Sequence, residues 1–196
     1  MTAGAGGREL LFVTANAHKL EEANLSLAPF GLHLKMAGVE KVEVQADRLD
    51  AIASYAARVA AEKSGKSVVC EDSGLFINVL GGFPGPYSSY AFRTIGCNGV
   101  LRLMVGSADR RCSFQSAVSY CAAGGSPITF MGVAEGSLAG KARGSRGFGF
   151  DPIFVPAAGD GRTFAQMEMA EKGQLSHRGD AFRRFARWTA GMAKLK

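Results

Sequence analysis

Residues 67–70 (S-V-V-C) lead directly into Glu71, Asp72, Ser73 and Gly74, and this junction constrains the fold more than any other segment. An apolar, β-branched run without alternating polar residues is typical of a strand buried on both faces of a sheet. In open α/β sheets, ligands bind just outside the carboxyl ends of such strands. Two adjacent carboxylates there repel each other, so they need a cation or a proton to coexist, and Mg²⁺ beside phosphate is the natural partner. The alternative is a solvated turn, because Asp, Ser and Gly are also turn residues.

Apolar periodicity along the rest of the chain predicts strands that alternate with helices. Helices are expected over residues 20–27, 49–63, 97–104 and 180–194. Strands are expected over 9–14, within 32–44, over 67–70 and 75–80, and as a hairpin over 113–122 and 128–138. We expect one α/β domain over residues 1–196, in which a long, twisted, mixed sheet carries helices on both sides. A second lobe would leave a central cleft between the two lobes.

Composition and charge restrict the class of protein. The formal charge of +6 favours an anionic partner without deciding between a nucleotide and a polymer. The four cysteines form no C-x-x-C pair, which is typical of reduced cysteines in the cytoplasm and not of a zinc site. No apolar run reaches the roughly 20 residues that span a bilayer, and residues 1–7 lack a basic-then-apolar export signal. We therefore expect a cytoplasmic protein without a membrane partner.

The turn over residues 14–19, between a predicted strand and a predicted helix, is a candidate anion site. Free amides at the start of a helix bind phosphate, and Lys19 adds a positive charge beside them. The spacing is not that of a P-loop. The alternative is an ordinary helix start with Asn16 as the N-cap. The residues of this candidate site are Thr14, Ala15, Asn16, Ala17, His18 and Lys19.

Two later segments carry side chains that suit a purine nucleotide. In residues 147–152 (G-F-G-F-D-P), glycines flank aromatic rings, so that the backbone can approach a flat ligand while the rings stack on it. The alternative for this segment is a pair of aromatic core residues in a loop. Residues 172–178 (K-G-Q-L-S-H-R) hold several donors for purine oxygens or phosphates. The alternative there is an exposed basic helix cap.

Five motifs, taken together and in this order, resemble those of the inosine triphosphate pyrophosphatase family. That family hydrolyses non-standard purine nucleoside triphosphates. The motifs are 14–19 (T-A-N-A-H-K), 71–75 (E-D-S-G-L), 81–88 (G-G-F-P-G-P-Y-S), 147–154 (G-F-G-F-D-P-I-F) and 176–178 (S-H-R). Each motif alone is weak, but five in the right order and at the right separations are specific, and they cover nearly the whole chain.

The resemblance implies a Mg²⁺-dependent hydrolase that converts ITP, dITP or XTP to the monophosphate and pyrophosphate. Asp72 would bind the metal and act as the general base, and Glu43 and Glu71 would be further metal ligands. Ser73 would contact the substrate beside the metal, and the triphosphate would lie along residues 14–19. The purine pocket and the groups that read the base would be Phe148, Gly149, Phe150, Asp151, Lys172, His177 and Arg178.

Two positions depart from the family pattern. Ala15 stands in place of a glycine, so this turn either avoids positive φ at that position or is strained. Phe150 stands where many members have Tyr or Trp, and it lacks their polar tip. The resemblance also implies a homodimer.

Two other hypotheses stay open at this point. One is a related pyrophosphatase that acts on modified pyrimidines, although such an enzyme would lack the motifs at 147–152 and 176–178. The other is a non-catalytic nucleotide- or RNA-binding module, which would explain the positive charge. Bare carboxylates at Glu43, Glu71 and Asp72 would repel a polyanion, so we expect no stable nucleic-acid partner.

Overall fold

The computed structural model describes residues 8–193; residues 1–7, on which part of the export argument rested, lie outside this range. One mixed sheet runs through the molecule in the order β2-β1-β3-β5-β6-β7, and β4 pairs with β3 off this path. The strands are β1 (Arg8–Phe12), β2 (Leu32–Met36), β3 (Val68–Ile77), β4 (Pro84–Gly85), β5 (Arg111–Cys121), β6 (Pro127–Leu138) and β7 (Phe154–Pro156). β1 is parallel to β2 and β3, and the other pairs are antiparallel.

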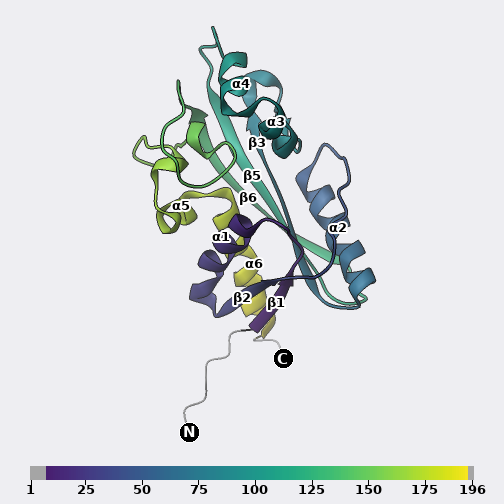
Figure 1. The fold of residues 1–196 in the computed structure, drawn as a ribbon. Helices are drawn as coiled ribbons and strands as arrows, with labels where there is room; N and C mark the ends of the chain where they lie inside the picture. The colour runs from purple at the N-terminus through teal and green to yellow at the C-terminus, as the bar shows by residue number, and fades with distance from the viewer. Residues whose placement is uncertain (1–7, 194–196) are drawn as a thin grey trace.

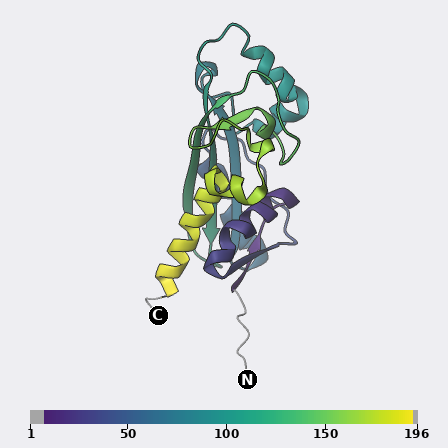
Figure 2. The same ribbon diagram turned by 90° about the vertical axis from the view of Figure 1, so that its left-hand side faces the viewer.

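Helices cover both faces of this sheet (Figures 1 and 2). The α-helices are α1 (Ala17–Leu27), α2 (Leu49–Ser64), α3 (Ser88–Thr94), α4 (Gly96–Leu103), α5 (Met169–Leu175) and α6 (His177–Ala193). Short 3₁₀ helices are η1 (Ala28–Phe30), η2 (Asn78–Leu80), η3 (Asp151–Ile153) and η4 (Phe164–Gln166). α2 packs on one face, α1, α5 and α6 pack together on the other, and α3 and α4 lie at one end of the sheet. The expected α/β fold, with a mixed sheet between helices, is confirmed.

The strand β3 corrects one sequence prediction. Separate elements were expected over 67–70 and 75–80, with a strand end or a turn at 71–74, but β3 runs without interruption from Val68 to Ile77. The reason is its partner β5, which pairs with all ten residues of β3, from Val68 opposite Cys121 to Ile77 opposite Cys112. A continuous ladder satisfies the backbone groups that a turn would leave to water. The adjacent carboxylates Glu71 and Asp72 therefore lie within a strand.

Hydrophobic cores occupy the two ends of β3 and leave its middle polar. Toward α3 and α4, Leu75 and Ile77 join a core with Phe114, Phe154 and Phe164. At the other end, the apolar residues of β3 join two cores on opposite faces of the sheet. These contain Phe12, Val69, Phe182 and Phe185 on the α6 side, and Val13, Ala56, Val68 and Cys70 on the α2 side. Residues 71–74 belong to none of these clusters, so the functional segment lies between two packed regions.

Local sequence patterns explain α2 and the hairpin of β5 and β6. α2 forms where apolar residues recur at helical spacing, and its Leu49, Ile52, Ala56 and Ala60 are buried. β5 and β6 form the expected hairpin, with Cys121 opposite Pro127 at the turn. Among residues 8–193, no helix combines the length and the apolar character that crossing a membrane requires.

Candidate active site

A cleft with a volume of about 1200 Å³ opens beside the middle of β3. On this edge β3 pairs only with β1, at Val68 and Val69, and with β4, at Leu75 and Phe76. Between these contacts β3 has no strand neighbour on this edge within the described range. Residues 71–74 therefore border the cleft, and the β1–α1 turn, the loop before α2, the start of α3 and residues 148–151 line its other sides.

The β1–α1 turn lies along the cleft through Thr14, Ala15, Asn16, Ala17 and Lys19. The Asn16 side chain caps α1 by accepting a hydrogen bond from the backbone N–H of Lys19 (3.2 Å), and the Asn16 N–H donates to Thr14 Oγ1 (3.1 Å). The helix-cap interpretation is therefore correct, and it places the turn beside the cleft. Among the described residues only glycines have positive φ, so Ala15 adopts its place in the turn without backbone strain.

Two expected substrate contacts, His18 and Lys172, do not line the cleft. Successive residues of a helix point about 100° apart, and His18 is an exposed residue of α1 that stacks on Phe148 with 5.5 Å between the ring centroids. Lys172 is buried because two carboxylates hold its ammonium. Its Nζ lies 2.6 Å from Glu22 Oε1 and 2.5 Å from Asp151 Oδ2.

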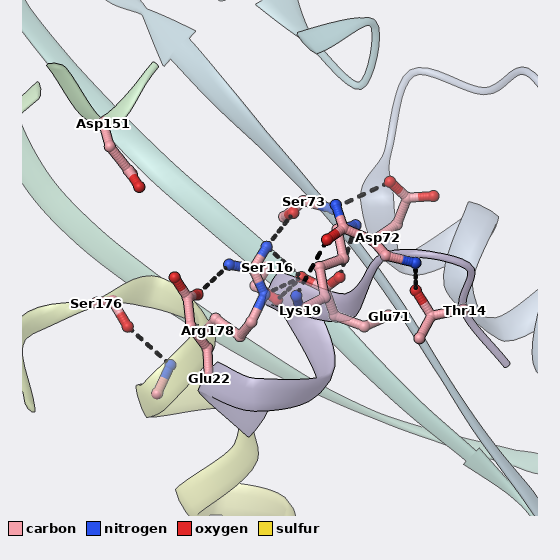
Figure 3. A network of polar contacts seen from close by, with 12 residues as sticks. Thr14, Lys19, Glu22, Glu71, Asp72, Ser73, Ser116, Asp151, Ser176 and Arg178 are labelled. Atoms are coloured by element: carbon pink, nitrogen blue, oxygen red, sulfur yellow. Dashed lines mark hydrogen bonds and ion pairs between the residues drawn. The ribbon is translucent and has the colours of Figure 1, made fainter. Parts of the chain in front are cut away.

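The carboxylate of Glu71 is surrounded by donors and is closed to solvent (Figure 3). Its Oε2 lies 2.8 Å from Lys19 Nζ, and its Oε1 accepts hydrogen bonds from Ser116 Oγ (2.7 Å) and Arg178 Nε (3.2 Å). Burial by itself raises the pKa of Glu71, but Arg178 and Lys19 outweigh it and hold the pKa well below its ordinary value. Both oxygens are engaged by cations of the protein, so the expected role of Glu71 as a metal ligand does not fit this geometry.

Arg178 connects three parts of the site through its guanidinium (Figure 3). Its Nη1 donates to Glu22 Oε2 (2.6 Å), its Nη2 donates to Ser73 Oγ (2.8 Å), and its Nε reaches Glu71. The guanidinium carbon also lies 5.3 Å from the ring centroid of Phe148. Arg178 and Lys172 are buried, so the alternative of an exposed basic cap at residues 172–178 is wrong.

Two members of this network, Glu22 and Ser116, were not predicted from the sequence. Glu22 is buried between Arg178 and Lys172; burial raises its pKa, but these two cations lower it below its ordinary value. A signal existed, because Glu22 follows Lys19 by three residues and so lies on the same side of the helix. Ser116 lies opposite Ser73 on the neighbouring strand β5, and only the strand register could have revealed it.

The segment 147–151 presents one aromatic ring and buries the other. Phe148 is half-buried beside the cleft, whereas Phe150 is 3% exposed and packs edge-on against Phe92. The interpretation as a core residue is therefore correct for Phe150. Asp151 is buried, which raises its pKa despite the nearby ammonium of Lys172, and its Oδ2 accepts a hydrogen bond from the Phe148 N–H (2.9 Å). Gly147 has φ +70, and a Cβ there would overlap that carboxylate.

His177 is buried at the start of α6 and borders the cleft. Its ring stacks on Phe114, with 4.6 Å between centroids and 10° between planes. Burial and the positive charge of Arg178 lower the pKa of His177 well below its ordinary value, so the imidazole is neutral at pH 7. Its Nδ1 has no hydrogen-bond partner among the described residues. A buried polar atom without a partner is unusual in a folded protein.

Asp72 presents its carboxylate to the cleft, with 14% of its side chain exposed. Its Oδ1 accepts the backbone N–H of Ser73 (3.0 Å), and its Oδ2 accepts a hydrogen bond from Lys41 Nζ (2.9 Å). The same ammonium lies 3.6 Å from Glu43 Oε1. Two of the predicted metal ligands, Asp72 and Glu43, thus converge on one cation. Within residues 8–193, no cluster of three or more His, Cys, Asp or Glu side chains is arranged to hold a metal.

The motif at 81–88 shapes the wall of the cleft. Ser88 Oγ donates to the carbonyl of Gly85 (2.7 Å) and accepts the backbone N–H of Leu75 (2.8 Å). β4 thereby approaches β3 so closely that a Cβ at Gly74 would overlap the Gly85 carbonyl. The glycine of the E-D-S-G-L motif is therefore required by packing.

Comparisons with known proteins identify close relatives. Residues 10–188 match the Ham1 family. A dITP/XTP pyrophosphatase from Methanopyrus kandleri is 47% identical over 180 residues, covering 92% of this chain and 95% of the relative. A dITP/XTP pyrophosphatase from Hyperthermus butylicus is 46% identical over 181 residues, covering 92% and 94%. Among solved structures, a HAM1 protein from Coxiella burnetii superimposes with a TM-score of 0.83 at 28% identity, covering 93% of this chain and 98% of that one.

Proposed function

The chain belongs to the Ham1 family, and from this premise we propose that it hydrolyses non-standard purine nucleoside triphosphates to the monophosphate and pyrophosphate. ITP, dITP and XTP are the proposed substrates, in line with relatives that are named dITP/XTP pyrophosphatases. The observation that carries this proposal is the convergence of segments from all five motifs around one cleft, with Asp72 in its wall. The rival of a non-catalytic binding module does not account for a carboxylate at that position.

Mg²⁺ is the proposed cofactor, and the donors present fit it. Mg²⁺ is a hard ion that proteins hold with one or two carboxylates while substrate phosphates complete the shell. Asp72 and Glu43 supply two such carboxylates, and their shared contact with Lys41 supports the view that both can face one positive charge. When bound, the metal would neutralise charge on the leaving pyrophosphate. Glu71 is not included in the proposed site because Lys19, Ser116 and Arg178 occupy it.

Proton transfer and binding of the triphosphate are assigned to different residues of the cleft. Asp72 would take a proton from the water that attacks between the α- and β-phosphates, because it is a carboxylate within the cleft. The amides at the start of α1 and the ammonium of Lys19 would hold the triphosphate. Ser73, held by Arg178, would contact the substrate beside the metal.

Selection of the base would rest on the opposite wall. Phe148 would stack on the purine, and Arg178 and His177 would lie near its edge, held in place by Glu22, Glu71 and Phe114. An arginine only donates hydrogen bonds, so it can pair with a 6-oxo group and cannot pair with the 6-amino group of adenine. Lys172, Gly149, Phe150 and Asp151 would act as the supporting frame of this pocket.

The deciding experiment follows pyrophosphate and inorganic phosphate separately, with ITP, XTP and ATP as substrates. We expect pyrophosphate from ITP and XTP in the presence of Mg²⁺, much slower turnover of ATP, and no turnover in EDTA. Release of inorganic phosphate, or equal rates for ITP and ATP, would contradict the proposal. A homodimer and a cytoplasmic location stay predictions from the sequence; light scattering after gel filtration tests the first.

A further inference from the structure

The loop between β2 and α2 places a lysine on the carboxylate that the proposed mechanism needs. Lys41 Nζ lies 2.9 Å from Asp72 Oδ2, and Lys41 is 31 residues away from Asp72 in the chain. The Lys41 side chain is 15% exposed and borders the cleft together with Asp72. This ion pair therefore fastens a loop without helix or strand to the central strand of the site.

The same loop carries the second proposed metal ligand. Glu43 is 77% exposed, and its Oε1 lies 3.6 Å from the Lys41 ammonium. Lys41 thus contacts both of the carboxylates that would hold a divalent cation. Two other cations of the cleft wall, Lys19 and Arg178, have Glu71 as their shared partner, and neither forms an ion pair with Asp72.

An ammonium and a divalent metal cannot share these oxygens without cost. Their repulsion rises with the product of the charges and with the inverse of their separation, and both would lie in contact with Asp72 Oδ2. A metal that takes Asp72 Oδ2 as a ligand must therefore break the contact between this oxygen and Lys41. The free energy of that contact is subtracted from the affinity for the metal.

We propose that Lys41 is the counter-ion of Asp72 in the metal-free protein and that a divalent metal binds by displacing it. Without metal, Lys41 would then link the loop between β2 and α2 to β3. Its contact with Asp72 would weaken metal binding. This inference rests on the proposed function only for the role of Asp72 as a metal ligand. It gives a role in metal binding to Lys41, a residue that lies outside all five motifs.

The test is a titration with Mn²⁺ in the absence of nucleotide, in which the paramagnetic resonance signal of the free ion reports binding. Lys41→Met removes the charge and keeps much of the side-chain volume, and Lys41→Arg restores a cation. Lys63→Met is the matched control, because Lys63 is exposed at the end of α2 and away from the cleft. We expect Lys41→Met to bind Mn²⁺ about tenfold more tightly than the unmodified chain, equivalent to about 1.4 kcal/mol.

The direction of this change separates exchange from a merely structural role. Loss of a structural contact would weaken metal binding or leave it unchanged, whereas exchange predicts a gain, with Lys41→Arg and Lys63→Met close to the unmodified protein. We also expect a lower melting temperature for Lys41→Met without metal. An affinity within twofold of the unmodified chain, or undetectable binding in both proteins, would overturn the proposal.

A second measurement does not depend on the folding of Lys41→Met. In the unmodified chain, the Lys41 side-chain methylene resonance, assigned by its absence in Lys41→Arg, should shift when Mg²⁺ is added, while the Lys63 resonance stays in place. A Lys41 resonance that does not respond would overturn the proposal. Neither readout uses turnover. A protein that shows the exchange but does not hydrolyse ITP would therefore contradict the proposed function and leave this inference standing.

Discussion

Arg178 Nη2 and Glu71 Oε1 lie 3.2 Å apart, and their side chains are 2% and 0% exposed. The pair joins the start of α6, which borders the proposed base pocket, to the strand that carries Asp72. Arg178 also donates hydrogen bonds to Glu22 through Nη1 and to Ser73 through Nη2. The second oxygen of Glu71, Oε2, lies beside the ammonium of Lys19. Since a buried charge that loses its partner is strongly destabilising, the removal of one member of this network should destabilise the fold.

The first prediction concerns Glu71→Gln. The amide keeps the shape but removes the charge that Lys19 and Arg178 share, so the partly buried Lys19 loses its ion pair and the buried Arg178 keeps only the one with Glu22. We expect the free energy of unfolding to fall by about 3–5 kcal/mol, as for other broken buried pairs. Urea denaturation without nucleotide or metal measures it. Glu62→Gln is the control, because Glu62 pairs with Arg58 on the exposed face of α2 and should change stability by less than about 1 kcal/mol. Equal effects of the two changes would show that the network does not hold the fold.

The second prediction concerns Asp72→Asn. An amide cannot take a proton from water and is a poor ligand for Mg²⁺, so we expect turnover of ITP to fall by roughly 10² to 10⁴. The circular dichroism spectrum should remain that of the unmodified protein, because Asp72 is outside the hydrophobic cores. Asp50→Asn, in the first turn of α2, should retain activity. Turnover by Asp72→Asn within a few fold of the unmodified enzyme would remove Asp72 from the mechanism.

The third prediction is a pH dependence of stability that arises from His177. The unfolded chain binds a proton on this histidine near pH 6.5, whereas burial and Arg178 hold the pKa of the folded side chain well below that value. Above pH 6.5 both states are neutral and the full stability is present. As the pH falls from 6.5 toward 5.0, only the unfolded state gains the proton. The free energy of unfolding should therefore fall by up to about 1.4 kcal/mol per pH unit.

The comparison of His177→Asn with the unmodified chain isolates this effect. Glu22 and Glu71, whose pKa values are lowered, change the free energy of unfolding only below about pH 4.5, where the unfolded carboxylates begin to gain protons. Asp151, whose pKa is raised, acts in the opposite sense and is present in both proteins. We expect the loss of stability between pH 6.5 and 5.0 to be absent in His177→Asn and to persist in His33→Asn, whose histidine is exposed on β2. A slope that survives in His177→Asn would contradict the assignment.

The fourth prediction separates phosphate binding from base selection with a matched pair, Lys19→Met and Arg178→Met. Each removes one cation from Glu71, so both disturb the network. Lys19 borders the turn proposed for the triphosphate, which ITP and ATP share, so its loss should lower kcat/KM for both alike. Arg178 is proposed to pair with the 6-oxo group, so its loss should lower kcat/KM for ITP at least tenfold more than for ATP. If the ratio of kcat/KM for ITP to kcat/KM for ATP changed equally in both variants, the proposed division of roles would be refuted.

Several features were predictable from the sequence because they depend on local patterns. The periodicity of α2 and the hairpin pattern of β5 and β6 predicted the correct elements, and the five motifs indicated the family that residues 10–188 match. The cap by Asn16 was also foreseeable, since a side chain two or three residues from a free amide can reach it. These features need no knowledge of which segments meet in space.

The sequence by itself determined the family, the α/β class and the segments that border the cleft, because motif order and periodicity are properties of the chain. Only the tertiary structure decided what each charged side chain faces. The ladder with β5 made 71–74 part of a strand, Lys19 and Arg178 enclosed Glu71, and Lys41 met Asp72. A carboxylate has the same sequence signature whether it faces a metal, an arginine or water. Its role depends on partners that are distant in the chain, and folding brings them together.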